Sequence, residues 1–99
     1  MNIDFLKHEI IDSQDNVFSA TVFFIYEDEF MKKHKGFLKV SNCSYLKDNI
    51  RKDSFVLEQI GLDEDVTFQK ETLEDDLGFE LIDMIKNNLV FYFKTYLKF

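Results

Sequence analysis

Residues 17–26 constrain the fold more than any other segment of the chain. They read Val-Phe-Ser-Ala-Thr-Val-Phe-Phe-Ile-Tyr, a run dense in the β-branched and aromatic side chains that favour strands. Every even position is apolar, whereas Ser19 and Thr21 begin the other side. Because side chains alternate between the two faces of a strand, this pattern predicts a β-strand with one buried face.

Other segments are candidates to complete a sheet around this strand. Residues 12–16 are turn formers, so a strand over residues 3–11 would make an antiparallel hairpin with residues 17–26, although Ile3, Leu6 and Ile10 would also line one side of a helix. A third strand is predicted over residues 37–42 and a short one over residues 66–68. Residues 44–62 fit either helix or strand. The charged segment 27–35 is expected to form a loop or a single helical turn that ends at Gly36.

The C-terminal third of the chain predicts a helix. Thr72 and the acidic residues after it approximate a capping box at its start, and Gly78 weakens its first turns. Apolar residues then recur every three or four positions, as on one face of a helix: Leu77, Leu81, Ile85, Leu89, Tyr92, Phe93 and Tyr96. The chain is therefore expected to form a single α+β domain over residues 1–99. Its three- to four-stranded antiparallel sheet would pack against one long C-terminal helix.

Charge is concentrated in residues 58–83, which hold ten acidic residues and one lysine, while the whole chain has a net charge of −7. Such a block attracts a basic partner over roughly one Debye length, about 8–10 Å in physiological salt. It disfavours direct binding to nucleic acid and to anionic membranes, because both attract Lys and Arg. The candidate partner-binding residues are Asp63, Glu64, Asp65, Glu71, Glu74, Asp75, Asp76, Glu80 and Asp83. The alternative is that these carboxylates only solvate one face.

Motifs for catalysis or cofactor binding are absent from the sequence. Residues 63–74 approach the ligand spacing of a helix–loop–helix calcium site, but Phe68 stands where glycine is required and Lys70 where an apolar residue is usual. Cys43 is the only cysteine, and neither histidine, His8 or His34, has the spacing of a nucleophilic or metal site. We therefore expect no metal, no cofactor and no enzymatic activity, with His34 solvated and Cys43 structural.

Two functions of different classes follow as hypotheses. A small acidic protein without catalytic motifs is suited to binding and blocking a basic protein, and a nuclease is a natural target because its substrate groove is built for phosphates. The first hypothesis is a bacterial immunity or antitoxin-type inhibitor of a toxin. It would be cytoplasmic, because the N-terminal residues carry charges where a signal peptide needs an apolar run. The alternative is a homodimeric structural or adaptor protein whose interface is the aromatic end of the C-terminal helix, namely Phe91, Phe93, Tyr96 and Phe99.

Overall fold

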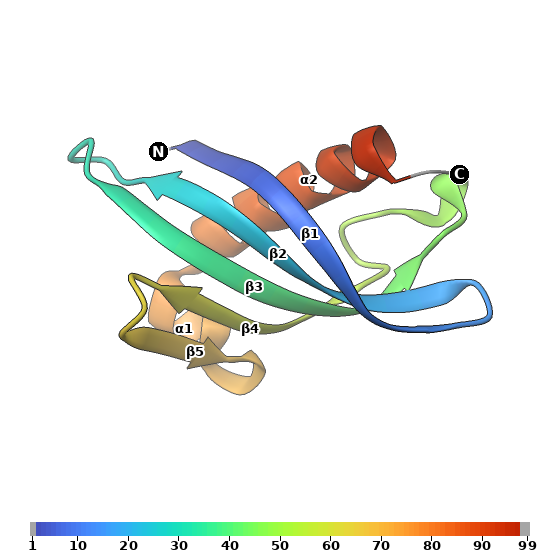
Figure 1. Cartoon of the computed structure of the whole chain (residues 1–99). Coiled ribbons are helices and arrows are strands. Elements are labelled where there is room, and N and C mark those ends of the chain that lie inside the picture. Colours follow the sequence, from blue (N-terminus) through green and yellow to red (C-terminus); the bar gives the residue numbers. More distant parts are fainter. Residues whose placement is uncertain (1, 98–99) are drawn as a thin grey trace.

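A computed structural model describes residues 2–97 and shows a five-stranded antiparallel sheet with a helix across one face (Figure 1). The strands are β1 (Asn2–Gln14), β2 (Val17–Glu27), β3 (Lys33–Ser44), β4 (Val56–Leu62) and β5 (Val66–Gln69). Each strand pairs with the next along the chain, so the sheet order is β1-β2-β3-β4-β5. Two short 3₁₀ turns, η1 (Lys47–Asn49) and η2 (Lys70–Thr72), precede β4 and α1 respectively, and the helices are α1 (Leu73–Leu77) and α2 (Phe79–Tyr96).

The α+β class is confirmed, but the sheet has five strands rather than three or four. Residues 2–14 form a strand. The region 44–62, for which the sequence allowed either helix or strand, contains the 3₁₀ turn η1 and the strand β4. Residues 33–35, expected to belong to a loop or to a single helical turn that ends at Gly36, begin β3 instead. They continue the register of β2, with Lys33 opposite Glu27 and Lys35 opposite Ile25. Backbone pairing across the hairpin thus overrides the local charge of this segment.

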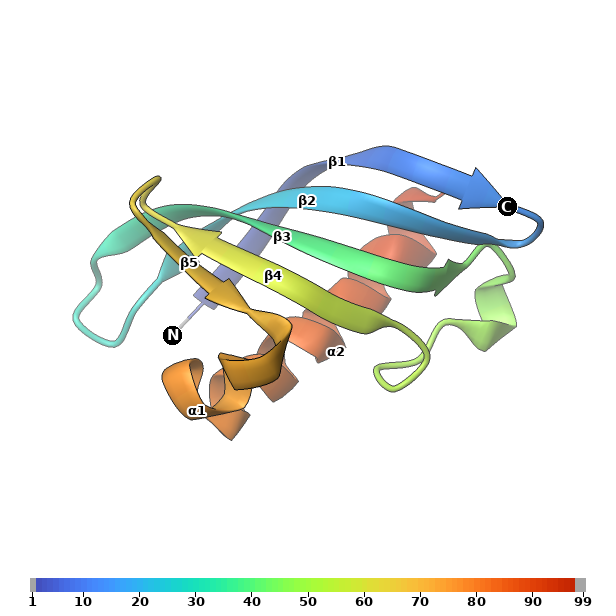
Figure 2. The ribbon, with the colours of Figure 1, turned by 90° about the horizontal axis from the view of Figure 1, so that it is seen from below.

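The core lies between the sheet and α2. The even positions predicted to be buried on β2, Phe18 through Phe24, are buried, and Leu38 and Val40 on β3 extend the same face. Leu89 and Phe93 of α2 close over them, and all these residues belong to one apolar cluster. Among residues 2–97, no helix crosses the opposite face of the sheet (Figure 2). Nor does any helix of this range combine the length and the apolar character needed to cross a bilayer.

The predicted single helix is broken at Gly78. Its φ of 88° and ψ of 148° are far from helical values, so the chain turns a corner between α1 and α2. The predicted capping box also does not form: the Thr72 hydroxyl donates to Asp76 at 2.7 Å rather than accepting a backbone amide. This corner decides where the acidic residues of the two helices point.

Candidate functional site

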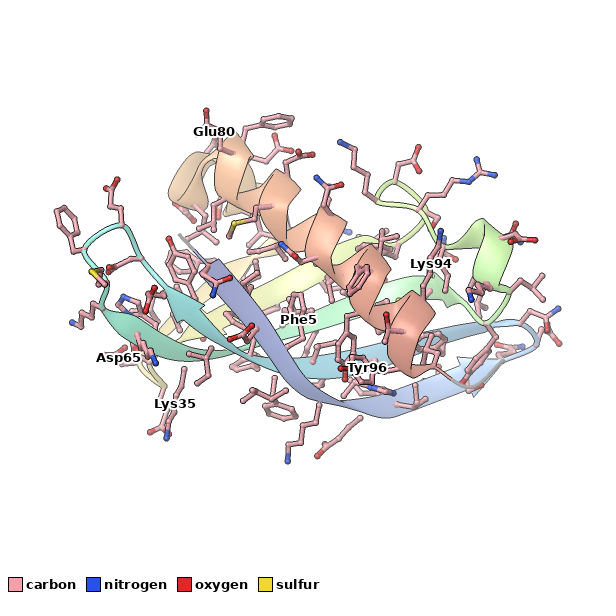
Figure 3. All side chains as sticks on the ribbon, turned by 90° about the horizontal axis from the view of Figure 1, so that it is seen from above. Phe5, Lys35, Asp65, Glu80, Lys94 and Tyr96 are labelled. Atoms are coloured by element: carbon pink, nitrogen blue, oxygen red, sulfur yellow. The ribbon has the colours of Figure 1, made fainter. Side chains whose placement is uncertain are left out.

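The acidic block does not form one continuous surface. Glu64 and Asp65 lie on the β4–β5 turn (residues 63–65), and β5, four residues or about 13 Å long, separates that turn from η2 and α1. This spacing exceeds a Debye length. Figure 3 shows Asp65 and Glu80 on opposite sides of the β2–β3 loop (residues 28–32). The carboxylates of the β4–β5 turn and those of η2 and α1 therefore form separate groups along the chain.

Several members of the block already have partners within the chain. The Lys52 ammonium donates to Asp83 at 2.8 Å, and this bond holds the pKa of the Asp83 carboxyl below its ordinary value. Ser41 Oγ donates to Glu58 at 2.8 Å. Asp63 accepts a hydrogen bond from His34. These carboxylates contribute to the fold and are less available to a partner than the length of the acidic block implies.

Two grooves collect most of the remaining acidic residues. The first, of about 400 Å³, lies between β4, α1 and α2, with Phe55, Leu57 and Ile82 among its apolar lining. Its charged lining comprises both acidic and basic side chains: Lys70, Glu71, Glu74, Asp75 and Lys86. Because the two signs are mixed within one groove, its field is weak compared with that of a groove of one sign.

The second groove, here called the acidic groove, lies between the β2–β3 loop and the α1–α2 corner. It has a volume of about 490 Å³ and is lined by Tyr26, Asp28, Glu29, Phe30, Leu77, Gly78, Phe79, Glu80 and Leu81. Three of these side chains are acidic, and none of the described residues that line it is basic. Two phenylalanines are unusually exposed, Phe30 at 83% and Phe79 at 67%. The groove thus joins negative charge to accessible aromatic surface.

Local structure explains how the loop side of this groove is built. Asp28 Oδ1 accepts hydrogen bonds from the backbone N–H groups of Phe30 and Lys32, both at 2.9 Å. The Asp28 amide donates to the carbonyl of Lys32, and Met31, with a φ of 65°, donates back to the carbonyl of Asp28. One aspartate therefore organises the whole loop and holds Phe30 beside the helix corner.

The corner side of the groove depends on Gly78. With its φ of 88° in a region that L residues rarely adopt, Gly78 ends α1 and lets α2 begin at once with Phe79 and Glu80. A continuous helix would rotate these two side chains to other positions. Glu80 is the one residue of the predicted partner-binding set that lines the acidic groove.

His34 was expected to be solvated, but its side chain is partly buried and has partners within the chain. Its Nε2 lies 2.9 Å from Asp28 Oδ2, its Nδ1 lies 2.6 Å from Asp63 Oδ2, and its ring stacks on Tyr26 with centroids 5.8 Å apart. The hydrogen bonds to Asp28 and Asp63 raise the pKa of His34, and the same bond to His34, followed by the loop amides, lowers the pKa of Asp28. Residues far apart in the sequence thus form one ion cluster beside the groove.

The remaining sequence candidates fall elsewhere. Cys43 is buried, which raises the pKa of its thiol to about 12, so the thiol stays protonated near neutral pH. His8 hydrogen-bonds the Tyr92 hydroxyl at 2.8 Å. The residues with the spacing of a calcium site do not share one loop, because Thr67 and Gln69 lie on β5. Within residues 2–97, no three His, Cys, Asp or Glu side chains are grouped so that they could hold a metal ion.

The aromatic residues proposed for a dimer interface divide between core and surface. Phe93 is only 1% exposed and packs edge-to-face on Phe18 and Phe55, so it is a core residue and not a free surface residue. Phe91 and Tyr96 are 72% and 63% exposed. Phe99 lies outside the described residues.

The acidic groove contains four residues that no sequence motif or spacing indicated: Asp28, Glu29, Phe30 and Phe79. A signal for the loop was present: Phe30 and Met31 are an apolar pair inside an otherwise charged segment, a position where burial is not expected. No comparable signal marks Phe79, whose exposure follows from the helix break. Compared with known protein families, characterised proteins and solved structures, the chain shows no match.

Proposed function

We propose that this protein binds a basic protein through the acidic groove and blocks it, in the manner of an immunity or antitoxin-type inhibitor. The observation that supports this proposal is the composition of the groove: three carboxylates and two exposed phenylalanines, without a basic side chain among the described residues that line it. A toxin with nuclease activity is the partner class that fits best, because its substrate site is basic.

The two kinds of side chain would contribute differently to binding. Asp28, Glu29 and Glu80 would attract Lys and Arg and accelerate the encounter, since complementary charge acts mainly on association. Phe30 and Phe79 would supply apolar contact area and would accept the alkyl stems and cationic heads of those residues. Aromatic anchors at the centre of an interface act mainly by slowing dissociation.

The test begins with capture of the partner from the host at low salt, followed by kinetics with the purified partner. In Glu29→Gln/Glu80→Gln, association should slow on the order of tenfold and its salt dependence should flatten. Glu64→Gln/Asp65→Asn removes the same charge from the β4–β5 turn and is the matched control. Phe30→Ser should instead raise the dissociation rate. If the groove and control variants behave alike, the acidic groove is not the binding surface.

A second candidate function is supported by the exposed aromatic residues of α2. Phe91 and Tyr96 could form a homodimer interface of a structural or adaptor protein. Sedimentation velocity over a hundredfold concentration range would reveal a dimer, and Phe91→Asp should abolish it. Phe91 is the residue to change, because substitution of the buried Phe93 would perturb the monomer itself. A monomer at all concentrations contradicts this candidate.

A further inference from the structure

His34 lies between two carboxylates that belong to different parts of the sheet. Asp28 is in the β2–β3 loop and Asp63 is in the β4–β5 turn, and each accepts a hydrogen bond from one nitrogen of the ring, at 2.9 and 2.6 Å. A neutral imidazole has one donor nitrogen, whereas the imidazolium has two. With both carboxylates ionised, only the protonated ring can satisfy them at the same time.

This arrangement, here called the histidine clamp, is connected to the acidic groove by two routes. Asp28 binds the ring through Oδ2 and the amides of Phe30 and Lys32 through Oδ1. The ring itself stacks on Tyr26, with an angle of 26° between the planes, and Tyr26 lines the groove. The position of Phe30 therefore depends on a carboxylate that His34 holds.

We propose that protonation of His34 keeps the acidic groove in its binding shape, so that the groove loses affinity for a basic partner as the pH rises. This inference rests on the proposed function, because it concerns regulation of the same site. When His34 loses its second proton, one of the two carboxylates loses its donor. The loop or the turn then separates from the ring, and Phe30 is no longer held at the helix corner.

The other charged groups near the ring set the range in which the clamp works. Lys33 and Lys35 flank it on β3, and Glu27 lies opposite Lys33. Burial, and after it the charges of Asp28 and Glu29, raises the pKa of Tyr26. The hydrogen bonds that His34 donates to Asp28 and Asp63 raise its pKa, so the clamp is intact near the ordinary histidine pKa, about 6.5, and opens as the pH rises through the raised pKa. It also weakens in acid, when Asp28 takes up a proton.

The sign of the pH effect separates a change of shape from a change of charge. Deprotonation makes the region one unit more negative, and this alone would strengthen binding to a cation, though only slightly, because Asp63 is exposed and water reaches His34 and Asp28 in part and screens the charge. Release of the loop removes Phe30 from the groove and weakens binding. We therefore expect weaker binding at high pH, and tighter binding at high pH would overturn the proposal.

The clamp is tested first in the isolated protein by NMR titration from pH 5.5 to 9. Only two histidines are present, and His34→Gln assigns their ring signals. We expect His34 to titrate above its ordinary pKa and the amide protons of Phe30 and Lys32 to shift along the same curve. An ordinary pKa for His34, or loop amides that ignore its titration, would refute the clamp. Asp63→Asn should lower the pKa of His34, whereas Asp65→Asn on the same turn should leave it nearly unchanged.

Binding is then measured with an N-acetylated hexa-arginine peptide, whose charge does not change over this range. Wild-type protein should bind it on the order of fivefold more tightly at pH 6 than at pH 9, and His34→Gln should reduce that ratio to near one. Equal affinity of the wild type at both pH values overturns the regulation. A peptide that binds at neither pH contradicts the proposed function instead, and the loop amides still decide whether the clamp exists.

Discussion

At the scale of single residues, two glycines allow aromatic rings to lie across neighbouring strands. A Cβ atom on Gly36 would lie 2.5 Å from the ring of Phe24 and 2.7 Å from the backbone oxygen of Gly61. A Cβ atom on Gly61 would lie 2.2 Å from the ring of Phe37. Each glycine is opposite its phenylalanine in the strand register. Gly36, expected to end a helical turn, is therefore a packing residue inside β3.

Gly36→Ala is expected to destabilise the protein by about 1–3 kcal/mol, the usual cost of overpacking. Phe24 is buried and the oxygen of Gly61 belongs to the backbone, so neither can move away easily. Urea unfolding measures the change in the free energy of unfolding. Lys39→Ala, at an exposed position of the same strand, is the control and should stay within about 0.5 kcal/mol. Equal effects of the two substitutions would show that the ring is free to shift.

At the scale of secondary-structure elements, α2 has two different sides. The helical spacing predicted its inward residues correctly for Ile85, Leu89, Tyr92 and Phe93, all of which are buried. The same spacing placed Tyr96 on this side, but it is exposed at the end of the helix. Periodicity identifies the side of a helix, whereas burial at each position depends on which side chains pack against it.

Truncation on the two sides of α2 should therefore differ sharply. Phe93→Ala is expected to cost about 3–5 kcal/mol, because it leaves a cavity among the rings of Phe18, Phe55 and Tyr92. Phe91→Ala, two residues away and exposed, should change stability by less than about 0.5 kcal/mol. Urea unfolding of both variants at low protein concentration makes the comparison without dimer formation. A large loss for Phe91→Ala would indicate a contact of this side chain that the described residues do not show.

At the scale of the whole molecule, ionisable groups from different elements shape the stability profile. Hydrogen bonds from His34 and Lys52 lower the pKa values of Asp28 and Asp83, and the bonds to Asp28 and Asp63 raise that of His34. A carboxyl whose pKa is lowered in the folded state stabilises the fold at pH values above its pKa in the unfolded chain, about 3.9. This contribution is lost as the pH falls. His34, whose pKa is raised, contributes its full stabilisation of the fold below about pH 6.5, and that contribution is lost as the pH rises.

Stability should therefore be greatest at about pH 5–6.5 and should decline on both sides. Chemical denaturation at intervals from pH 3 to 9 gives the profile. His34→Gln should flatten the alkaline decline, and Asp83→Asn should reduce the acid decline. An alkaline limb that is identical in wild type and His34→Gln would assign that decline to other groups.

The sequence by itself determined the α+β class, the buried face of β2 and most of the inward side of α2. These features follow from local alternation and helical spacing, which need only neighbouring residues. It did not determine that residues 33–36 extend a strand, because cross-strand pairing rather than local preference decides this.

Only the tertiary structure decided where the charges act. Gly78 turns α2 away from α1, so a block of carboxylates that is continuous in the sequence divides between two grooves, a turn and internal ion pairs. Asp28, His34 and Asp63 meet because β3 is paired with both β2 and β4. Coulomb interactions depend on distance in space, and a sequence specifies that distance only after the strands have found their partners.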